Sequence, residues 1–417
     1  MESLGSHSRS YEWEIVVIIF LTWGFVFLDR TAISYILPVL VDEMDLTAGQ
    51  VGKINMWQTI GYALAGPIIG IISDRTGKRK SLLIAMVIAT AIFSALSAFA
   101  NSYGALLVIR FLVGAAEGPI LPLAVTLVAA ASSTGRFGRN VGIVNAGVAV
   151  ISGTLGPTLT TQLVAITNWH LAFVIVSLPS FILALIIWKV AIEVPVPNVQ
   201  ASIIKEEKKV SLLEVLKYRN VVVSIFISIS MMAGFWILIV FAPLYLTTVG
   251  NLSMKNMGFV ISTMGIVTIC TSILVPLFSD KFGRKPALII FASLAGFAPL
   301  GLFLFPGGVI GNVAMILCGG LFGAIAPIYM NIIPEETMPP HLRATTSALI
   351  IGIGEIFGAA FVVGGAGTIA DFYGLPIVMI IAAAAGLLIA LLGFGLIETN
   401  PRKKQKAATI ESEAVIS

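Results

Sequence analysis

The sequence predicts an all-α integral membrane protein with twelve transmembrane helices, arranged as two six-helix bundles related by pseudo-two-fold symmetry. Three observations support this fold class. Only 11% of the 417 residues are charged, against about 25% in soluble domains, and the mean hydropathy is +1.01. Twelve apolar runs lie between clusters of charge, each near the roughly 20 residues that span a bilayer. A loop motif of the first half recurs in the second half.

The apolar runs form two groups of six, separated by a polar stretch. We expect them near residues 14–37, 51–73, 82–100, 104–131, 141–165 and 170–192, and then near 221–249, 257–279, 287–305, 309–333, 344–370 and 374–397. The predicted domains are a tail 1–13, a first bundle 14–192, a linker 193–220, a second bundle 221–397 and a tail 398–417. The linker carries a charged run at 205–209 and then an amphipathic stretch, which we expect to lie along the membrane surface.

The basic residues predict the orientation of the chain in the membrane. Of the 25 Lys and Arg residues, only Lys53 and Lys255 fall outside when both termini are cytoplasmic, and Arg30 and Arg110 fall within the membrane. The positive-inside rule therefore places both termini in the cytoplasm. We expect a multi-pass protein of the cell membrane, either inner or plasma membrane.

The repeated loop motif follows the second and the eighth predicted helices. Asp74 and Asp280 lie 206 residues apart, and Arg139 and Arg343, after helices four and ten, lie 204 apart. Glycine permits the tight turn in each loop, and the aspartate can cap or salt-bridge a neighbouring helix end. We expect these loops to have a conformational or gating role, and the residues that we expect to carry it are Gly70, Asp74, Arg75, Gly77, Arg79, Asp280, Gly283 and Arg284.

The first of these loops resembles the Gly-x-x-x-Asp-Arg-x-Gly-Arg-Lys signature of the major facilitator superfamily of secondary transporters. Lys78 stands where the signature has arginine, and the second copy is degenerate, with Pro276 and Lys281 at the first glycine and the arginine positions. The resemblance covers roughly residues 12–400. It implies a monomer in which two six-helix bundles alternate access to a central site.

Five charged residues lie inside the predicted helices, namely Asp29, Arg30, Arg110, Glu117 and Glu355. A charge at the bilayer centre costs about 2.5–3.5 kcal/mol, so such residues usually face partners or water. Arg110 and Glu117 are seven residues apart and share a helix face. Asp29 and Arg110 are expected at similar depths in the membrane, so we expect them to pair. This pairing leaves Arg30 facing the cavity and Glu117 without a fixed cation. A static network that anchors the first and fourth helices is the alternative.

These assignments predict anion transport coupled to protons. Arg30 would attract an anion, and its planar fork matches a carboxylate. Glu117 would carry a proton at physiological pH, because desolvation disfavours its charged form.

The same residues resemble the anion:cation symporter branch of the superfamily, which includes bacterial sugar-acid symporters and is similar to vesicular glutamate and sialic-acid carriers. The resemblance implies that Arg30 contacts the substrate carboxylate and that Asp29 and Glu117 are protonation sites. It also implies that Arg110 is the partner of Asp29 and that Tyr62 helps to bind substrate.

Other side chains are candidates for either substrate binding or packing. Gln58 and Tyr62 share a face of the second helix. Glu355 either faces the cavity as a second titrating group or is protonated and buried in packing, and of the two we favour the cavity. The predicted substrate-binding residues are Arg30, Tyr62, Gln58, Asn145, Trp236 and Tyr245. The predicted proton-coupling residues are Asp29, Glu117, Arg110 and Glu355.

The sequence therefore predicts a secondary active transporter that imports an organic anion, a sugar acid or another carboxylate, together with protons. The main alternative is a drug:proton antiporter, since exporters also carry acids in these helices, although a cavity arginine favours anions. No enzyme is expected, because no metal-ligand cluster, nucleophile elbow or nucleotide loop is present in the sequence. The expected partners are a small carboxylate, H⁺ and membrane lipid, with no nucleic acid and no metal or other cofactor. Na⁺ stays open as the coupling ion.

Overall fold

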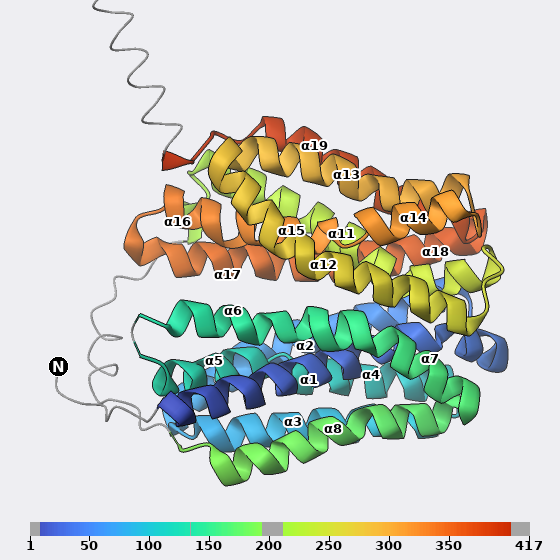
Figure 1. Ribbon diagram of the computed structural model, residues 1–417, viewed down its shortest axis with the longest axis horizontal. Helices are drawn as coiled ribbons and strands as arrows, with labels where there is room; N and C mark the ends of the chain where they lie inside the picture. Colours follow the sequence, from blue (N-terminus) through green and yellow to red (C-terminus); the bar gives the residue numbers. More distant parts are fainter. Residues whose placement is uncertain (1–8, 134, 194–211, 402–417) are drawn as a thin grey trace, which may run out of the picture. The chain divides into compact units, whose positions relative to one another are not determined.

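The computed structural model describes residues 9–133, 135–193 and 212–401. Within these segments the chain forms helices and no strand, and twelve helical spans are long and apolar enough to cross a membrane. Figure 1 shows long helices, some of which bend along their length, as where α6 continues into α7. The predicted fold class, an all-α protein of twelve transmembrane helices, is confirmed.

Six spans precede the linker, and several are built from more than one helical segment. The fourth span breaks at Gly118-Pro119, where the sequence allows a bend, so that α4 ends at Glu117. The segments are α1 (Arg9–Met44), α2 (Ala48–Thr76), α3 (Arg79–Leu96), η1 (Ser97–Phe99), α4 (Tyr103–Glu117), α5 (Ile120–Ala131), α6 (Phe137–Gly147), the π-helical η2 (Val148–Leu155), α7 (Gly156–Ile166) and α8 (Trp169–Val190).

Six further spans follow the linker. Two of them contain π-helical segments, η3 and η5, which widen the helix locally. The segments are α10 (Leu212–Val215), α11 (Arg219–Thr248), α12 (Met254–Phe282), α13 (Arg284–Leu304), α14 (Val309–Cys318), α15 (Leu321–Pro327), η3 (Ile328–Ile332), α16 (Ile333–Thr337), η4 (Pro340–Leu342), α17 (Arg343–Ile353), η5 (Gly354–Val362), α18 (Val363–Tyr373) and α19 (Pro376–Phe394).

Several helices extend beyond the apolar runs that predict them. The first run was expected at 14–37, but α1 continues from Arg9 to Met44, because a helix need not end where the hydrocarbon ends. The predicted linker falls mostly on residues 194–211, outside the described segments, and only the short α10 represents its amphipathic stretch.

The chain divides into two compact units that differ from the predicted bundles. One unit comprises residues 1–206 and 239–266, and the other comprises 207–238 and 267–417. The division passes through α11 and α12. The polar loops that mark the ends of helices in the sequence therefore do not indicate where the two units divide. The boundaries 14–192 and 221–397 stay a prediction for the bundles, and each unit is described by itself below.

In the first unit, α1 is enclosed by its neighbours. It packs against α8, α6 and η2, while α2 packs against α4. Ile15, Ile19 and Trp23 of α1 belong to one buried apolar cluster. At the start of the helix, the buried Glu12 carboxylate accepts hydrogen bonds from the Arg136 guanidinium and from Asn140 Nδ2. α1 is therefore fixed along its length, and this holds its two adjacent charged residues in place.

Candidate functional site

Three glycines bring α2 and α4 of the first unit into backbone contact. A Cβ added at Gly114 would overlap the Gln58 carbonyl oxygen, and one added at Gly118 would overlap the carbonyl oxygen of Tyr62. Gly61 faces the carbonyl of Phe111 in the same way. Only glycine allows this approach between membrane helices. It places the side chains of α2 beside the charged face of α4.

Gly114→Ala is expected to push α2 and α4 apart and to lower the unfolding temperature of the detergent-solubilised protein by several degrees. Overpacking typically costs about 1–3 kcal/mol, and here the added methyl meets backbone, which cannot rotate away. Gly104→Ala in the same helix is the matched control, because a Cβ there meets nothing within 4 Å. Equal unfolding temperatures for the two variants would contradict the close approach.

Arg110 of α4 joins three helices from a fully buried position. Its Nε and Nη2 donate to Gln58 Oε1 at 3.3 and 3.0 Å. Nη2 also donates to the backbone carbonyls of Asp29 and Arg30 at 3.2 and 2.9 Å. Arg110 thus holds α1 and α2 together at the level of the charged pair.

The expected ion pair between Asp29 and Arg110 is wrong. The Asp29 carboxylate points to α8, where Oδ2 accepts a hydrogen bond from Ser180 Oγ at 2.6 Å. Arg110 reaches the main chain of Asp29 and not its carboxylate. Helix periodicity indicates the face on which a residue lies, but the acceptors that a long side chain selects depend on the neighbouring helices.

Arg30 and Glu117 form the ion pair of this site, so the expectation that Glu117 lacks a cation is also wrong. Arg30 Nη1 lies 3.5 Å from Glu117 Oε1, and both side chains are buried. Arg30 Nη2 donates to Thr59 Oγ1 at 3.5 Å, and its guanidinium stacks 4.7 Å from the centre of the Tyr62 ring. The Arg30 side chain thus reaches Glu117, the last residue of α4.

The arrangement holds two arginines and two carboxyl groups in the membrane interior. When all four are ionised the cluster is neutral, which lowers the cost of burial. An added anion would disturb that neutrality unless a carboxyl group took up a proton. Both events involve Arg30. An added anion would bind its guanidinium, and the proton would go to Glu117, the carboxylate with which Arg30 pairs.

Sequence reasoning missed Ser180 and Thr59, whose hydroxyl groups hydrogen-bond to the side chains of Asp29 and Arg30. No pattern distinguishes them from the many serines and threonines of membrane helices that bond to their own backbone.

The other predicted binding residues lie on α6 and α11. Asn145 is exposed on α6 and donates to the Val141 carbonyl of its own helix. Trp236 and Tyr245 are buried residues of α11, and Trp236 packs edge-to-face on Phe235. Trp236 and Glu355 belong to the second unit. The substrate role of Asn145, Trp236 and Tyr245 stays a prediction.

The repeated loops have the turn geometry that the sequence predicts. Gly77 ends α2 with φ 68°, and Gly283 separates α12 from α13 with φ 108°. These positive φ values favour glycine. Each glycine N–H donates four residues back, to the carbonyl of Ser73 or of Ser279. In the first loop, Arg79 lies 3.8 Å from Asp74. Among the described residues, no such turn hydrogen bond or ion pair involves Gly70 or Arg75, and their gating role stays a prediction.

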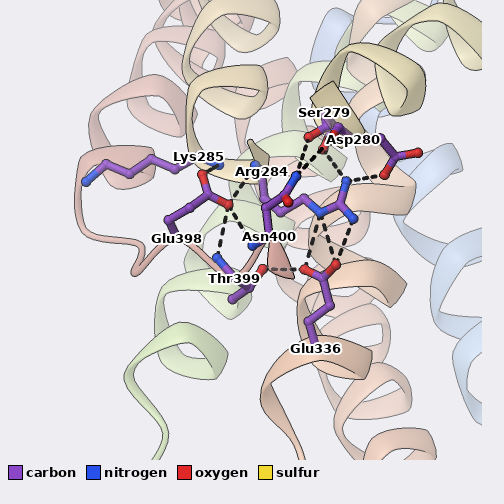
Figure 2. Close-up of polar contacts among 8 residues, drawn as sticks. All are labelled: Ser279, Asp280, Arg284, Lys285, Glu336, Glu398, Thr399 and Asn400. Carbon is purple, nitrogen blue, oxygen red and sulfur yellow. Dashed lines mark hydrogen bonds and ion pairs between the residues drawn. The ribbon is translucent and has the colours of Figure 1, made fainter. Parts of the chain in front are cut away.

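In the second unit, Arg284 is the centre of a polar cluster at the α12–α13 turn, drawn in Figure 2. Its guanidinium bonds to Asp280, to Ser279 Oγ and to both carboxylate oxygens of Glu336. Thr399 also donates to Glu336. The segment that follows α19 is thereby tied to the ends of α12 and α16.

Two glutamates missed by sequence reasoning repeat this anchoring in both halves. Glu398 accepts the backbone N–H groups of Arg284 and Lys285, at the start of α13. Glu193 accepts those of Lys80 and Ser81, at the start of α3. Glu193 and Glu398 lie 205 residues apart, so the spacing of the repeat contained the signal.

Twelve apolar helices among the described residues, each long enough to cross a membrane, together with the buried charge cluster on α1 and α4, are the features of a polytopic membrane transporter. The chain belongs to the Major Facilitator Superfamily, whose family model matches residues 19–362. It is therefore a transporter and not an enzyme.

Curated relatives and solved structures agree with this assignment. The chain is 25% identical over 351 residues to the probable 4-methylmuconolactone transporter of Cupriavidus pinatubonensis, covering 82% of this chain and 80% of the relative. It is 29% identical over 251 residues to the hexuronate transporter of Bacillus subtilis, covering 59% of each. A bacterial homologue of the human lysosomal transporter Spinster shares the fold, with a TM-score of 0.78, 18% identity and coverage of 93% and 97% of the two chains.

Proposed function

We propose that the protein is a proton-coupled symporter that imports a small organic carboxylate by alternating access. The observation that carries the proposal is the buried ion pair between Arg30 and Glu117. The names of the relatives support an organic-acid cargo, since they include transporters of hexuronate, niacin and 4-hydroxybenzoate. The distribution of basic residues supports a membrane protein with both termini cytoplasmic. Membership of the superfamily supports a monomer in the cell membrane.

The coupling follows from competition for one guanidinium. Glu117 and a substrate carboxylate both require Arg30, and two carboxylates beside a single cation repel each other. A proton on Glu117 removes that repulsion and frees the Arg30 fork for bidentate contact with the substrate. By linkage, bound substrate favours the proton on Glu117 to the same extent. Proton and anion therefore travel together.

The surrounding residues position this exchange. Arg110 holds the backbone of Asp29 and Arg30 and so fixes the origin of the Arg30 side chain. Gln58 gives its Oε1 to Arg110, while its buried Nε2 has no hydrogen-bond partner in the described chain and is available to a substrate oxygen. The Tyr62 ring supports the Arg30 guanidinium from one side. Asp29 is the second protonation site.

Uptake into proteoliposomes tests the proposal. Radiolabelled hexuronate, 4-hydroxybenzoate and nicotinate would be offered with and without a pH gradient, acidic outside. We expect one acid to accumulate only with the gradient. Expulsion of a lipophilic cation under the same gradient, with no acid accumulated, would overturn symport and support the drug exporter.

Glu117→Gln is expected to abolish gradient-driven accumulation and to retain exchange of labelled for unlabelled acid. Glutamine keeps the shape of protonated glutamate but cannot release the proton. Glu14→Gln, at an exposed position of α1, is the matched control and should accumulate substrate like the wild type. Normal accumulation by Glu117→Gln would exclude the proton role.

A further inference from the structure

A polar cavity of the first unit lies at the end of α1 that is opposite the N-terminus. Its volume is about 270 Å³, and its lining comes from the end of α1, the connection between η1 and α4, and the starts of α4 and α8. The lining residues with titratable side chains are Glu43, Tyr103 and His170. Arg30 and Glu117 do not line this cavity, so it is separate from the candidate site described above.

The ring of His170 is held in one orientation and one tautomer. Its Nδ1 lies 2.5 Å from the backbone carbonyl oxygen of Ala98, and a carbonyl can only accept, so Nδ1 carries the hydrogen. The ring also stacks on Trp169, with 3.6 Å between the ring centres. In the neutral ring Nε2 therefore bears the lone pair, and this atom lies 3.8 Å from Glu43 Oε1.

The carboxylate of Glu43 is oriented by a hydrogen bond of its own. Its Oε2 accepts from Trp169 Nε1 at 2.6 Å, and the Trp169 side chain is almost fully buried. This leaves Oε1 next to His170 Nε2. When His170 is neutral, both atoms are acceptors and no hydrogen lies between them. A cation placed between the two atoms would satisfy both.

This pair of atoms has the chemistry of a zinc site. Zn²⁺ binds imidazole nitrogen and carboxylate oxygen, whereas Mg²⁺ and Ca²⁺ prefer oxygen ligands. A histidine that binds a metal usually donates its other ring N–H to a carboxylate or a backbone carbonyl, as His170 does to Ala98. Two ligand atoms of a tetrahedral zinc ion lie about 3.4 Å apart, and the separation here is 3.8 Å, so a small rotation of either side chain is sufficient.

The geometry indicates an ion that exchanges with the solution. The side chains of His170 and Glu43 are 45% and 52% exposed, so an ion can reach both. Within the described residues no group of three or more His, Cys, Asp and Glu side chains could hold a metal ion, so water would complete the coordination. Tyr103 lines the same cavity, and its hydroxyl has no hydrogen-bond partner in the described parts of the chain, which leaves it available to such a water.

We propose that His170 Nε2 and Glu43 Oε1 bind a Zn²⁺ ion in this cavity. The ion joins the end of α1 to the start of α8. The same two helices are joined at the charge cluster by the hydrogen bond between Asp29 and Ser180. Zn²⁺ therefore restrains α1 against α8 and is expected to slow carboxylate uptake reversibly. This consequence rests on the proposed function, whereas the binding of the ion does not.

Thermal unfolding of the whole chain in detergent tests the binding itself. The protein is first freed of metal with a chelator and then titrated with ZnCl₂ or, as the matched control, with MgCl₂. A ligand that binds the folded state raises the unfolding temperature in a saturable manner. We expect a rise of a few degrees with ZnCl₂ and none with MgCl₂.

Two conservative variants assign the rise to this cavity. His170→Gln removes the imidazole. Glu43→Gln replaces the carboxylate with an amide whose oxygen can still accept the hydrogen bond from Trp169. Each substitution is expected to weaken the apparent affinity for Zn²⁺ by at least about tenfold. Each variant is compared with its own metal-free form, so that a change in basal stability does not enter the result.

Three control variants should keep the rise. His341→Gln and Cys270→Ser remove exposed side chains that could bind Zn²⁺ elsewhere on the protein. Arg30→Ala should lose carboxylate uptake and still respond to ZnCl₂, which distinguishes a failure of this site from a failure of the proposed function. No rise with ZnCl₂, an equal rise with MgCl₂, or an undiminished rise in His170→Gln would overturn the zinc site.

Discussion

Replacing Arg30 with alanine is expected to reduce carboxylate uptake at least about 100-fold. Charge-assisted hydrogen bonds contribute about 1.5–3 kcal/mol each, and a bidentate fork provides two of them. The variant also leaves Glu117 without the cation that lies 3.5 Å away. Initial rates of uptake into proteoliposomes, at matched protein density, give the measurement.

Two further variants separate the shape of Arg30 from its charge. Arg30→Lys keeps the charge but loses the planar fork, so we expect a rate between those of the wild type and Arg30→Ala. Lys53→Ala removes the same charge from an exposed position of α2 and should transport normally. Wild-type uptake by Arg30→Ala would exclude Arg30 from the binding site.

Arg110→Met is expected to lower both stability and transport, with about 3 kcal/mol lost from the free energy of unfolding. Methionine fills similar space but leaves Asp29 and Glu117 with only Arg30 as a cation, and an uncompensated buried charge is costly. It also removes the guanidinium group that donates hydrogen bonds to Gln58 Oε1 and to two backbone carbonyls of α1. The unfolding temperature in detergent is the measurement.

A double variant tests whether charge balance explains the loss. Arg110→Met with Asp29→Asn restores a neutral cluster, so it should unfold at a higher temperature than Arg110→Met alone. Arg110→Lys should not recover stability fully, because one ammonium group cannot reach Gln58 and the α1 carbonyls together. An Arg110→Met protein as stable as the wild type would contradict the anchoring role.

The sequence was sufficient to predict the spans and the buried charges, because apolar runs and rare intramembrane charges are local signals. It was not sufficient to pair those charges. Arg110 donates to the backbone of α1, and Arg30 pairs with Glu117. α2 and α4 also approach closely at Gly114. Such an approach depends on three-dimensional packing, which helix periodicity does not specify.

Other features were hidden for different physical reasons. Ser180 and Thr59 belong to residue types that are common in any membrane helix. Glu193 and Glu398 lie beyond the ends of α8 and α19, in segments that hydropathy treats as polar loops. Their spacing of 205 residues matches the repeat, so a search for offset pairs of acidic residues would have found them.

The pH dependence of substrate binding tests the central claim most directly. The dissociation constant of the acid identified by uptake would be measured between about pH 5 and 8 for the wild type and for Glu117→Gln. Since substrate and proton favour each other, wild-type affinity should rise as the pH falls, by up to tenfold per pH unit for each linked proton. The slope for Glu117→Gln should be lower by about one proton, with tight binding retained at high pH. Equal slopes for the two proteins would contradict the competition of substrate and Glu117 for Arg30.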